Sequence, residues 1–452
     1  MNKSTRLLHF FLQAIEGEIY AHGERLPSLR EVCRVHQVSM STAKKVYYDL
    51  ERQGYVQACP REGFRVLTGA RPTINNTELA DWRWQLQQPA PAAWGSPFIH
   101  PSLAYAPSLA QAYQRALRHP PSDHPPMAGF DPLRRQIARR YLEQGVAVDW
   151  RQLLITCGAM EGLQLALRVV SQAKPQAKIV VMTPAFPSVF DLLQQAQIPY
   201  CCLAVEQEDD LVPQLAALAS TDALAGVVLM SQCRHPDGKA LSDRCKTALV
   251  EFATQQQLPL IEDDTYRELI YDGQPRLPLL ALDRQGIVLH TASFSKTFAS
   301  GHRVGWLATG RFHHAICALK HSSTLGSPLP SQHALATFLA EDQAEPHLSR
   351  LRPLLQQRIQ LMRDTALAVF PTGTHIETPA GGYFLWVKLP SELDPMAVLP
   401  LALRQGIHFA PGSLCQPHQA PHYLRLNASA YLPAQAAYLT QLGSLLQHSL
   451  NP

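Results

Sequence analysis

Apolar residues near the N-terminus recur with the 3.6-residue spacing of an α-helix. The first 20 residues are therefore predicted to form an amphipathic helix, with Gly23 after it as a stop signal. The apolar face of this helix would consist of Leu7, Leu8, Phe11, Leu12, Ile15 and Ile19. A second helix is predicted to begin at Pro27-Ser28, because Ser28 and Glu31 have the spacing of a capping box.

The next segment predicts one more helix and a pair of short strands. Ser39 or Ser41 would cap a helix that runs to about Gln53. Two short segments, residues 55–56 and 64–66, then flank a Pro-Arg-Glu-Gly turn, as in a small hairpin. Three helices followed by a hairpin in fewer than about 70 residues are typical of a winged helix-turn-helix domain.

From about residue 96 onward, helical patterns alternate with short segments that are apolar almost throughout. Such segments are typical of strands covered on both faces, as in a parallel sheet. They comprise residues 153–156, 178–182, 200–205, 226–230, 259–262, 287–291 and 305–308. The sequence therefore predicts an α/β fold with a mostly parallel sheet, followed from about residue 330 by a smaller α+β subdomain.

Three parts are predicted along the chain. Residues 1–68 would form the DNA-binding domain, and residues 96–452 the large domain. The segment between them, residues 69–95, is polar and then rich in proline and alanine, which is typical of a linker. At 452 residues the chain is long enough for two or three domains.

Composition favours a globular protein and excludes the common membrane classes. Of the residues 46% are hydrophobic and 17% are charged, and neither a run of 18 apolar residues nor a signal-peptide pattern occurs. None of the nine cysteines forms a C-x-x-C pair, so no metal site is predicted and a reducing cytoplasm is expected. The first 70 residues carry ten basic and seven acidic side chains, out of a net charge of +4 for the whole chain. This excess is useful for binding nucleic acid only if the basic residues share a face.

The N-terminal domain resembles the GntR family of bacterial regulators. The residues that carry the resemblance are Gly23, Leu26-Pro27-Ser28, Arg30, Val38-Ser39, Thr42, Leu50-Glu51, Gly54-Tyr55 and Gly63. The resemblance implies that the helix over residues 40–52 lies in the major groove of double-stranded DNA. The residues expected to contact bases or phosphates are Arg30, Ser41, Thr42, Lys44 and, in the hairpin turn, Arg61. Met40 and Cys59 stand where the family often has basic residues, so base specificity or affinity would differ.

Lys296 stands just after a predicted strand, in the turn Ser293-Phe294-Ser295-Lys296-Thr297. A sheltered lysine can lose its proton and form a Schiff base with an aldehyde such as pyridoxal phosphate. Ser293 and Arg303 are candidates to bind the phosphate oxygens. Gly158-Ala159-Met160 opens a helix after another strand, so Ala159 and Met160 would offer free backbone amides to the same anion.

Four more residues complete the requirements of such a cofactor. Asp263 ends a strand and would face the pyridine nitrogen, and Tyr266 would hydrogen-bond the ring hydroxyl. Phe186 would stack on the ring. Arg425 would pair with the α-carboxylate of a substrate or effector, a bidentate role that suits guanidinium. This order resembles the fold type I aminotransferases.

Both resemblances together are those of the MocR subfamily of GntR regulators, and they cover residues 3–67 and about 96–445. The resemblance implies pyridoxal 5'-phosphate as cofactor and a homodimer in which each head rests against the large domain of the partner. The aminotransferase motif Asn-Pro-x-Gly is His235-Pro236-Asp237-Gly238 in this chain. His235 would take the place of the asparagine at the ring hydroxyl.

Two departures bear on cofactor affinity. An unperturbed histidine titrates near neutrality, so His235 predicts cofactor binding that depends on pH between 6 and 8. The phosphate-binding tyrosine expected in residues 125–129 is absent, and His124 is the nearest substitute. Both departures bear more on turnover than on cofactor binding.

The leading hypothesis is a cytoplasmic transcription regulator. An amino acid or amine effector would displace Lys296 by aldimine exchange, anchored by Arg425, and shift the fit of two heads to paired half-sites on DNA. One alternative is an active aminotransferase with a regulatory head, although nothing in an ordinary aminotransferase requires residues 1–67. The other is a DNA-binding dimer that has lost the cofactor, which only His235 and the missing tyrosine support.

Overall fold

The chain divides into two compact units, Met1–Gln85 and Leu86–Pro452. The computed structural model describes residues 3–16, 19–20, 23–52, 55–59, 63–66, 85–86, 88–104, 106–118, 124–272, 274, 276–417 and 421–450. Within these residues no helix is both long enough and apolar enough to cross a membrane.

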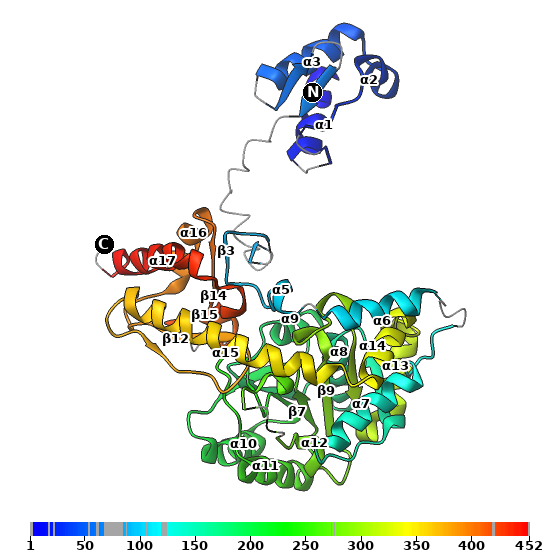
Figure 1. Cartoon of the computed structure of the whole chain (residues 1–452), viewed down its shortest axis with the longest axis vertical. Helices are drawn as coiled ribbons and strands as arrows, with labels where there is room; N and C mark the ends of the chain where they lie inside the picture. The colour runs from blue at the N-terminus through cyan, green and yellow to red at the C-terminus, as the bar shows by residue number, and fades with distance from the viewer. Residues whose placement is uncertain are drawn as a thin grey trace. The chain divides into compact units, whose positions relative to one another are not determined.

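The smaller unit consists of three helices and a two-stranded antiparallel sheet (Figure 1). Its elements are α1 (Lys3–Glu16), α2 (Leu29–His36), α3 (Met40–Arg52), β1 (Val56–Cys59) and β2 (Gly63–Val66). Its core is formed by Leu7, Phe11, Ile15, Val32, Val46, Tyr47, Leu50 and Val66, all buried. Ile19 is 72% exposed, so the apolar face predicted for the first helix ends before it.

Side-chain caps fix where the helices of this unit begin. The Ser28 hydroxyl accepts a hydrogen bond of 3.2 Å from the backbone N–H of Glu31 at the start of α2, as the predicted capping box requires. At the start of α3 the hydroxyl that accepts from the backbone is that of Ser39, at 3.2 Å from the N–H of Thr42. Of the two predicted cap residues, Ser39 and not Ser41 therefore fills that role.

The larger unit is built on a seven-stranded sheet with the order β4-β10-β9-β8-β7-β5-β6. Every predicted strand is present: β4 (Leu153–Thr156), β5 (Lys178–Thr183), β6 (Tyr200–Ala204), β7 (Leu224–Leu229), β8 (Leu260–Asp263), β9 (Val288–Ser293) and β10 (Gly305–Ala308). Only β10 runs antiparallel to its neighbours, so the sheet is mostly parallel as predicted. The predicted α/β fold is thereby confirmed.

Helices cover both faces of this sheet, which explains why its strands are apolar at successive positions. Leu154 packs in a cluster with α8 (Ala159–Ala173) and α13 (His313–Ser323). Its neighbours on β4, Leu153 and Ile155, pack in a cluster with α7 (Asp131–Glu143) and α14 (Leu329–Ala340). The carboxyl ends of the parallel strands are left at one edge of this three-layered structure, where ligands bind in open α/β sheets.

The C-terminal part forms the predicted smaller α+β subdomain. The helix α15 (Ala344–Val369) leads to a four-stranded sheet with the order β11-β12-β15-β14. Its strands and later helices are β11 (His375–Ile376), β12 (Phe384–Lys388), α16 (Pro395–Arg404), β14 (Ala410–Pro411), β15 (Tyr423–Asn427) and α17 (Ala436–His448).

Residues 92–94, which the sequence assigned to the linker, belong to the larger unit. The two residues of β3 (Ala92–Ala93) pair in parallel with β13 (Ile407–His408), and Trp94 is completely buried. The linker predicted over residues 69–95 is therefore too long at its C-terminal end. Backbone pairing and burial of an indole fix residues 92–94 to the larger unit, although the surrounding Pro- and Ala-rich composition is typical of a linker.

Candidate functional site

Lys296 lies in a single turn of 3-10 helix, Phe294–Lys296, directly after β9. Its side chain is 8% exposed, and its Nζ donates a hydrogen bond of 2.9 Å to the carbonyl oxygen of Pro97. The aromatic rings of Phe98, Phe186 and Tyr266 surround it, each with its centroid 5.4–5.5 Å from Nζ.

Burial lowers the pKa of Lys296 to about 7, even though the nearby Asp263 carboxylate acts in the opposite direction. The positive charges of Arg425 and Arg303 add to the lowering of this pKa. A lysine with such a pKa carries a large fraction of neutral amine near neutral pH. It is therefore able to attack an aldehyde, which an ordinary surface lysine does poorly.

The residues predicted to hold a phosphate meet near Lys296. Arg303 donates 3.3 Å hydrogen bonds to the hydroxyl of Ser295 and to the carbonyl oxygen of Cys157. Gly158, with φ of +74°, precedes α8, whose first two residues are Ala159 and Met160. A Cβ on Gly158 would lie 2.6 Å from a guanidinium nitrogen of Arg303, so only glycine permits this approach.

A second glycine brings β9 to the same place. Gly305 on β10 pairs with Ser293, and a Cβ on Gly305 would lie 2.6 Å from the carbonyl carbon of Gly158. Ser293, at the end of β9, accepts a 3.4 Å hydrogen bond from the N–H of Ser295. The start of α8, Ser293 and Arg303 thus form one cradle of backbone amides, a hydroxyl and a guanidinium, the donor set that binds phosphate.

Asp263 is the last residue of β8, the central strand of the sheet, and Tyr266 follows three residues later. Burial raises the pKa of Asp263, against hydrogen bonds from the hydroxyl of Thr265 and from its N–H at 3.1 Å. The Tyr266 hydroxyl is buried and makes no hydrogen bond of ordinary length within the described residues, although it interacts with the Tyr383 hydroxyl, which donates to the Pro97 carbonyl. A buried donor without a partner is costly, so this hydroxyl fits a ligand oxygen that is not part of the protein.

Arg425 lies on β15 and is 2% exposed. Its guanidinium donates to the ring Nε2 of His235 at 3.1 Å and to the carbonyl oxygen of Gly95. No carboxylate pairs with it within the part of the chain that the structure describes, and burial lowers its pKa. A buried guanidinium with only neutral partners is a strong site for an anion that comes from outside.

His235 departs from the expectation drawn from its residue type. Burial lowers its pKa well below the usual value, and the positive charges of Arg425 and Lys296 act in the same direction. Burial thus favours the neutral ring, in contrast to the histidine titrating near neutrality that the residue type alone predicts. Because Nε2 accepts from Arg425, the proton is on Nδ1, which is buried and has no partner.

His124 is the residue that the sequence offers in place of the missing tyrosine. His124 is exposed, and no hydrogen bond to it is present within the described residues. Sequence reasoning also missed the segment of residues 95–98. Besides the bonds from Arg425 and Lys296, it is held by the side-chain amide of Asn427, which donates to the carbonyl oxygens of Ser96 at 2.9 Å and Phe98 at 2.6 Å.

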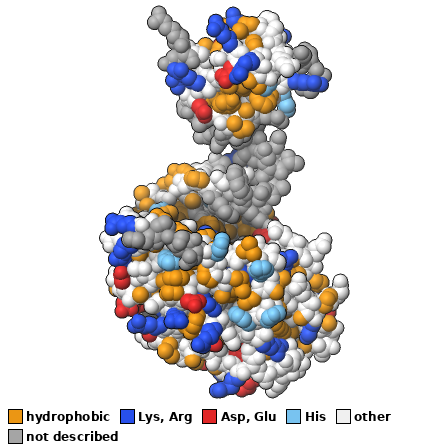
Figure 2. All heavy atoms as spheres, turned by 90° about the vertical axis from the view of Figure 1, so that its right-hand side faces the viewer, with side chains coloured by type: hydrophobic (Ala, Val, Ile, Leu, Met, Phe, Trp, Pro, Cys, Tyr) orange, Lys and Arg blue, Asp and Glu red, His pale blue; other side chains and the backbone are white. Residues whose placement is uncertain are grey.

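In the smaller unit, the predicted DNA-contacting residues lie on the surface of two helices. Arg30 on α2 and Ser41 and Lys44 on α3 are exposed, and Thr42 is half-buried. The hydroxyls of Ser41 and Thr42 each lie 2.8 Å from that of Ser39 at the beginning of α3. Arg61 lies outside the described residues. Figure 2 shows Lys and Arg side chains spread over the surface of this unit.

Comparisons with known proteins agree with this two-part structure. A family model described as Aminotransferase class I and II matches residues 102–441, and one described as Bacterial regulatory proteins, gntR family, matches residues 8–66. The chain is 31% identical to YdcR and 28% identical to YjiR, both described as uncharacterized HTH-type transcriptional regulators of Escherichia coli strain K12. Each alignment covers 100% of both chains.

Solved structures show the same fold for the larger unit. The kynurenine aminotransferase of Pyrococcus horikoshii superposes with a TM-score of 0.75 at 22% identity, over 84% of this chain and 96% of that one. The multiple substrate aminotransferase of Thermococcus profundus gives a TM-score of 0.74 at 21% identity, with the same coverage. The chain belongs to the aminotransferase class I and II family and carries a gntR-family head, the combination of the MocR-type transcriptional regulators.

Proposed function

We propose that this regulator binds pyridoxal 5'-phosphate through Lys296 and senses an amino acid or amine by exchanging Lys296 for the effector's amino group. The observation that carries the proposal is a buried lysine with a pKa of about 7, next to a phosphate cradle and an unpartnered tyrosine hydroxyl. A DNA-binding head in the same chain gives such a sensor an output.

The residues present fit the cofactor. The amides at the start of α8, with Ser293 and Arg303, would hold the phosphate, and Tyr266 and the Nδ1–H of His235 would donate to the ring oxygen. The Asp263 carboxylate, whose pKa burial raises, would gain a compensating charge from a protonated ring nitrogen. When bound, the cofactor supplies an electrophilic aldehyde carbon that no amino-acid side chain offers.

An amino-acid effector would place its carboxylate at Arg425. Its carboxylate would be a counter-ion for a buried guanidinium whose present partners are a carbonyl group and an imidazole. Lys296, once released from the cofactor, would return to the Pro97 carbonyl. Effector binding would thus change the partners of both Arg425 and Lys296. An effector can shift a conformational equilibrium only if it interacts differently with the two states, and these changes would provide that difference.

Double-stranded DNA would be bound by two heads of a homodimer at paired half-sites. A head of three short helices offers few base contacts, so two copies provide the area that specific recognition needs. Ser41, Thr42 and Lys44 would contact DNA from the start of α3, with Arg30 beside them and Arg61 on the hairpin turn. A protein with this task works in the cytoplasm.

The second candidate is an active aminotransferase. It is favoured by the complete set of Lys296, Asp263, Tyr266 and Arg425 around one site, because a neutral lysine next to the reacting carbon can move a proton. The unpartnered atoms of Tyr266 and His235 count against the third reading, in which the cofactor has been lost. A site that no longer bound a cofactor would not be expected to retain buried donors without hydrogen-bond partners.

The decisive experiment is an absorbance spectrum of the purified full-length protein with pyridoxal phosphate, for the wild type and for Lys296→Ala. A visible band of a lysine–pyridoxal Schiff base is expected in the wild type and its loss in the variant. No band in either protein would rule out both sensing and transamination. Repeated turnover with an amino donor and a keto acid would favour the aminotransferase, whereas an effector-dependent change in DNA affinity that Lys296→Ala lacks would favour the regulator.

A further inference from the structure

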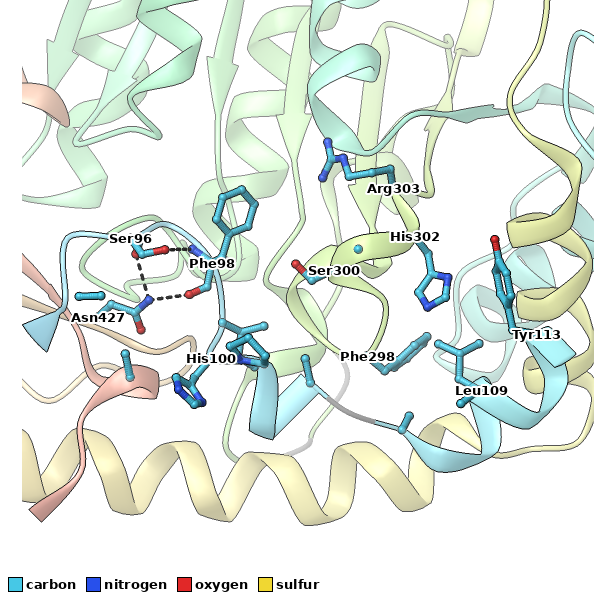
Figure 3. Close-up of a pocket in the computed structure, with 18 of the residues that line it drawn as sticks. Ser96, Phe98, His100, Leu109, Tyr113, Phe298, Ser300, His302, Arg303 and Asn427 are labelled. Carbon is cyan, nitrogen blue, oxygen red and sulfur yellow. Dashed lines mark hydrogen bonds between the residues drawn. The ribbon is translucent and has the colours of Figure 1, made fainter. Parts of the chain in front are cut away.

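A large cavity lies next to Lys296 and Arg425. Its volume is about 940 Å³, which is at the upper end of the range for small-molecule sites. Phe98 connects the two places, because its side chain lines the cavity and its ring centroid is 5.4 Å from the Nζ of Lys296. Ser96 and Asn427 also line it, beside the Gly95 carbonyl that holds Arg425. Figure 3 shows Phe98, Asn427 and Arg303 around this cavity.

The wall of the cavity is mainly apolar. Its large side chains come from the segment before α5 (Pro101–Ala104), from α6 (Pro107–Arg118) and from the loop after Lys296. They are Phe98, Ile99, Leu109, Tyr113, Leu117 and Phe298. Such a wall gains free energy by covering an apolar ligand group, and it offers nothing to replace the water of a charged one.

Charged partners are nearly absent from the wall. Among the lining residues, all of them described, Arg303 is the one Lys, Arg, Asp or Glu, and it is bonded at the phosphate cradle. Burial lowers the pKa of the two lining histidines, His100 and His302, and so favours their neutral form. Arg425 is thus available for one carboxylate, and no second cation is available for another.

We infer that the effector is a monocarboxylate with a large apolar side chain, such as a branched-chain or aromatic amino acid, and that dicarboxylic amino acids are excluded. This inference rests on the proposed function for the role of Arg425. The α-carboxylate pairs with Arg425 while the side chain covers Phe98 and enters the apolar cavity. A second carboxylate would lose its water without gaining a counter-ion, which costs more than an apolar group gains.

The test uses carboxylic acids without an amino group, which bind at Arg425 but cannot react with the cofactor. Binding of 3-phenylpropionate, 4-methylvalerate, propionate, succinate and glutarate to the full-length protein is measured by calorimetry, with and without pyridoxal phosphate. The two large apolar acids are expected to bind at least about tenfold more tightly than propionate, succinate or glutarate. Equal or tighter binding of succinate or glutarate would overturn the inference, as would no binding of any acid.

Phe98→Ala tests whether the wall carries the preference. Phe98 is 41% exposed, so its removal spares the core. The variant is expected to bind 3-phenylpropionate about tenfold more weakly and propionate within about twofold of the wild type. The matched control is Leu142→Ala, on an exposed side chain of α7 outside the cavity, which should change neither affinity. Loss of affinity for both acids alike in Phe98→Ala would contradict a role in selectivity.

The same samples separate this inference from the proposed function. A missing Schiff-base band together with selective binding of the apolar acids would refute the cofactor mechanism and leave the preference of the site in place. A normal band together with preference for the dicarboxylates would leave the mechanism in place and overturn the inference about the effector.

Discussion

Two buried lysines of the larger unit have opposite surroundings. Lys320, on α13, is completely buried and donates to the Glu161 carboxylate at 2.7 Å and to the Ser327 hydroxyl at 3.0 Å. Lys296 is almost as deeply buried, yet its hydrogen bond goes to a neutral carbonyl, and no carboxylate lies within ion-pair distance in the described structure. The ion pair of Lys320 with Glu161 therefore needs no ligand. Lys296 has no such partner among the described residues, so its burial carries a cost in free energy that a bound ligand would offset.

Two buried arginines differ in the same way. Arg134 is buried and has a carboxylate partner in Asp131 at 2.7 Å. Arg425 is more deeply buried and has none. Among the residues that the structure describes, Lys296 and Arg425 are the buried lysine and arginine side chains without an acidic partner, and they lie at one site, next to the carboxyl ends of β8 and β9. A missing partner is a better guide to function here than the presence of a charge.

The comparison is tested most strongly by stability. Replacement of Lys320 leaves the partly buried Glu161 without its cation, so Lys320→Met is expected to lower the free energy of unfolding by about 3 kcal/mol. Lys296→Met is expected to leave the free energy of unfolding of the cofactor-free protein unchanged or to raise it. Urea denaturation of both variants and the wild type measures this difference. Equal losses in the two variants would show that Lys296 is satisfied by the protein after all.

Arg425 should matter for ligands and not for the fold. Because its partners are neutral, Arg425→Gln is expected to weaken binding of a carboxylate effector by about a hundredfold, with little change in the free energy of unfolding. Calorimetry with 3-phenylpropionate and urea denaturation check the two parts. Arg134→Gln is the matched control, and it should affect stability while leaving ligand affinity intact.

The lowered pKa of Lys296 predicts how stability varies with pH. Between about pH 7 and the ordinary lysine pKa of 10.5, the unfolded chain holds more protons at this residue than the folded one. Stability of the cofactor-free protein from this residue therefore rises with pH, by about 1 kcal/mol between pH 7 and 8. The difference between wild type and Lys296→Met, followed over this range, isolates the contribution. A difference that does not change with pH would contradict the lowered pKa.

The smallest effect is expected at His235. A ring that stays neutral from pH 6 to 8 cannot change the pH dependence of cofactor binding, which then comes mainly from Lys296. The His235→Asn variant should show the same ratio of cofactor affinities at pH 6 and pH 8 as the wild type, within about twofold. Spectroscopic titration with pyridoxal phosphate at both values of pH provides the measurement. A ratio that flattens in the variant would restore the titrating histidine that the sequence predicted.

Much of the fold could be predicted because it rests on local signals. Apolar segments bounded by polar turns located all seven strands of the large sheet, and the Ser28 cap located α2. The direction of β10 was not predictable, because an apolar segment has the same composition whichever way it runs. The order of the strands was equally hidden, since it depends on connections across the whole sheet.

The candidate site was predictable in its side chains and not in its backbone. Lys296, Asp263 and Arg303 carry recognisable spacing, but the carbonyl groups of Gly95 and Pro97 have no signature in a sequence. Gly95 is the last residue of the predicted linker and Pro97 lies just after it, next to Trp94, which is completely buried. The pKa of His235 was mispredicted for the same reason, because its surroundings come from β15 and the turn after β9, far away in the sequence.

The four consecutive carbonyl groups of residues 95–98 each accept a hydrogen bond from a side chain of the larger unit. Pro97 has two donors, Lys296 and the Tyr383 hydroxyl at 3.0 Å, and Asn427 holds the residues on either side of it. Gly95 receives its side-chain hydrogen bond from Arg425. The Pro97 carbonyl thus has two side-chain donors, whereas the Gly95 carbonyl has one. A ligand that draws Arg425 away would release the Gly95 carbonyl, directly after the residues that β3 and Trp94 fix to the larger unit, and would leave the other three carbonyl groups bonded.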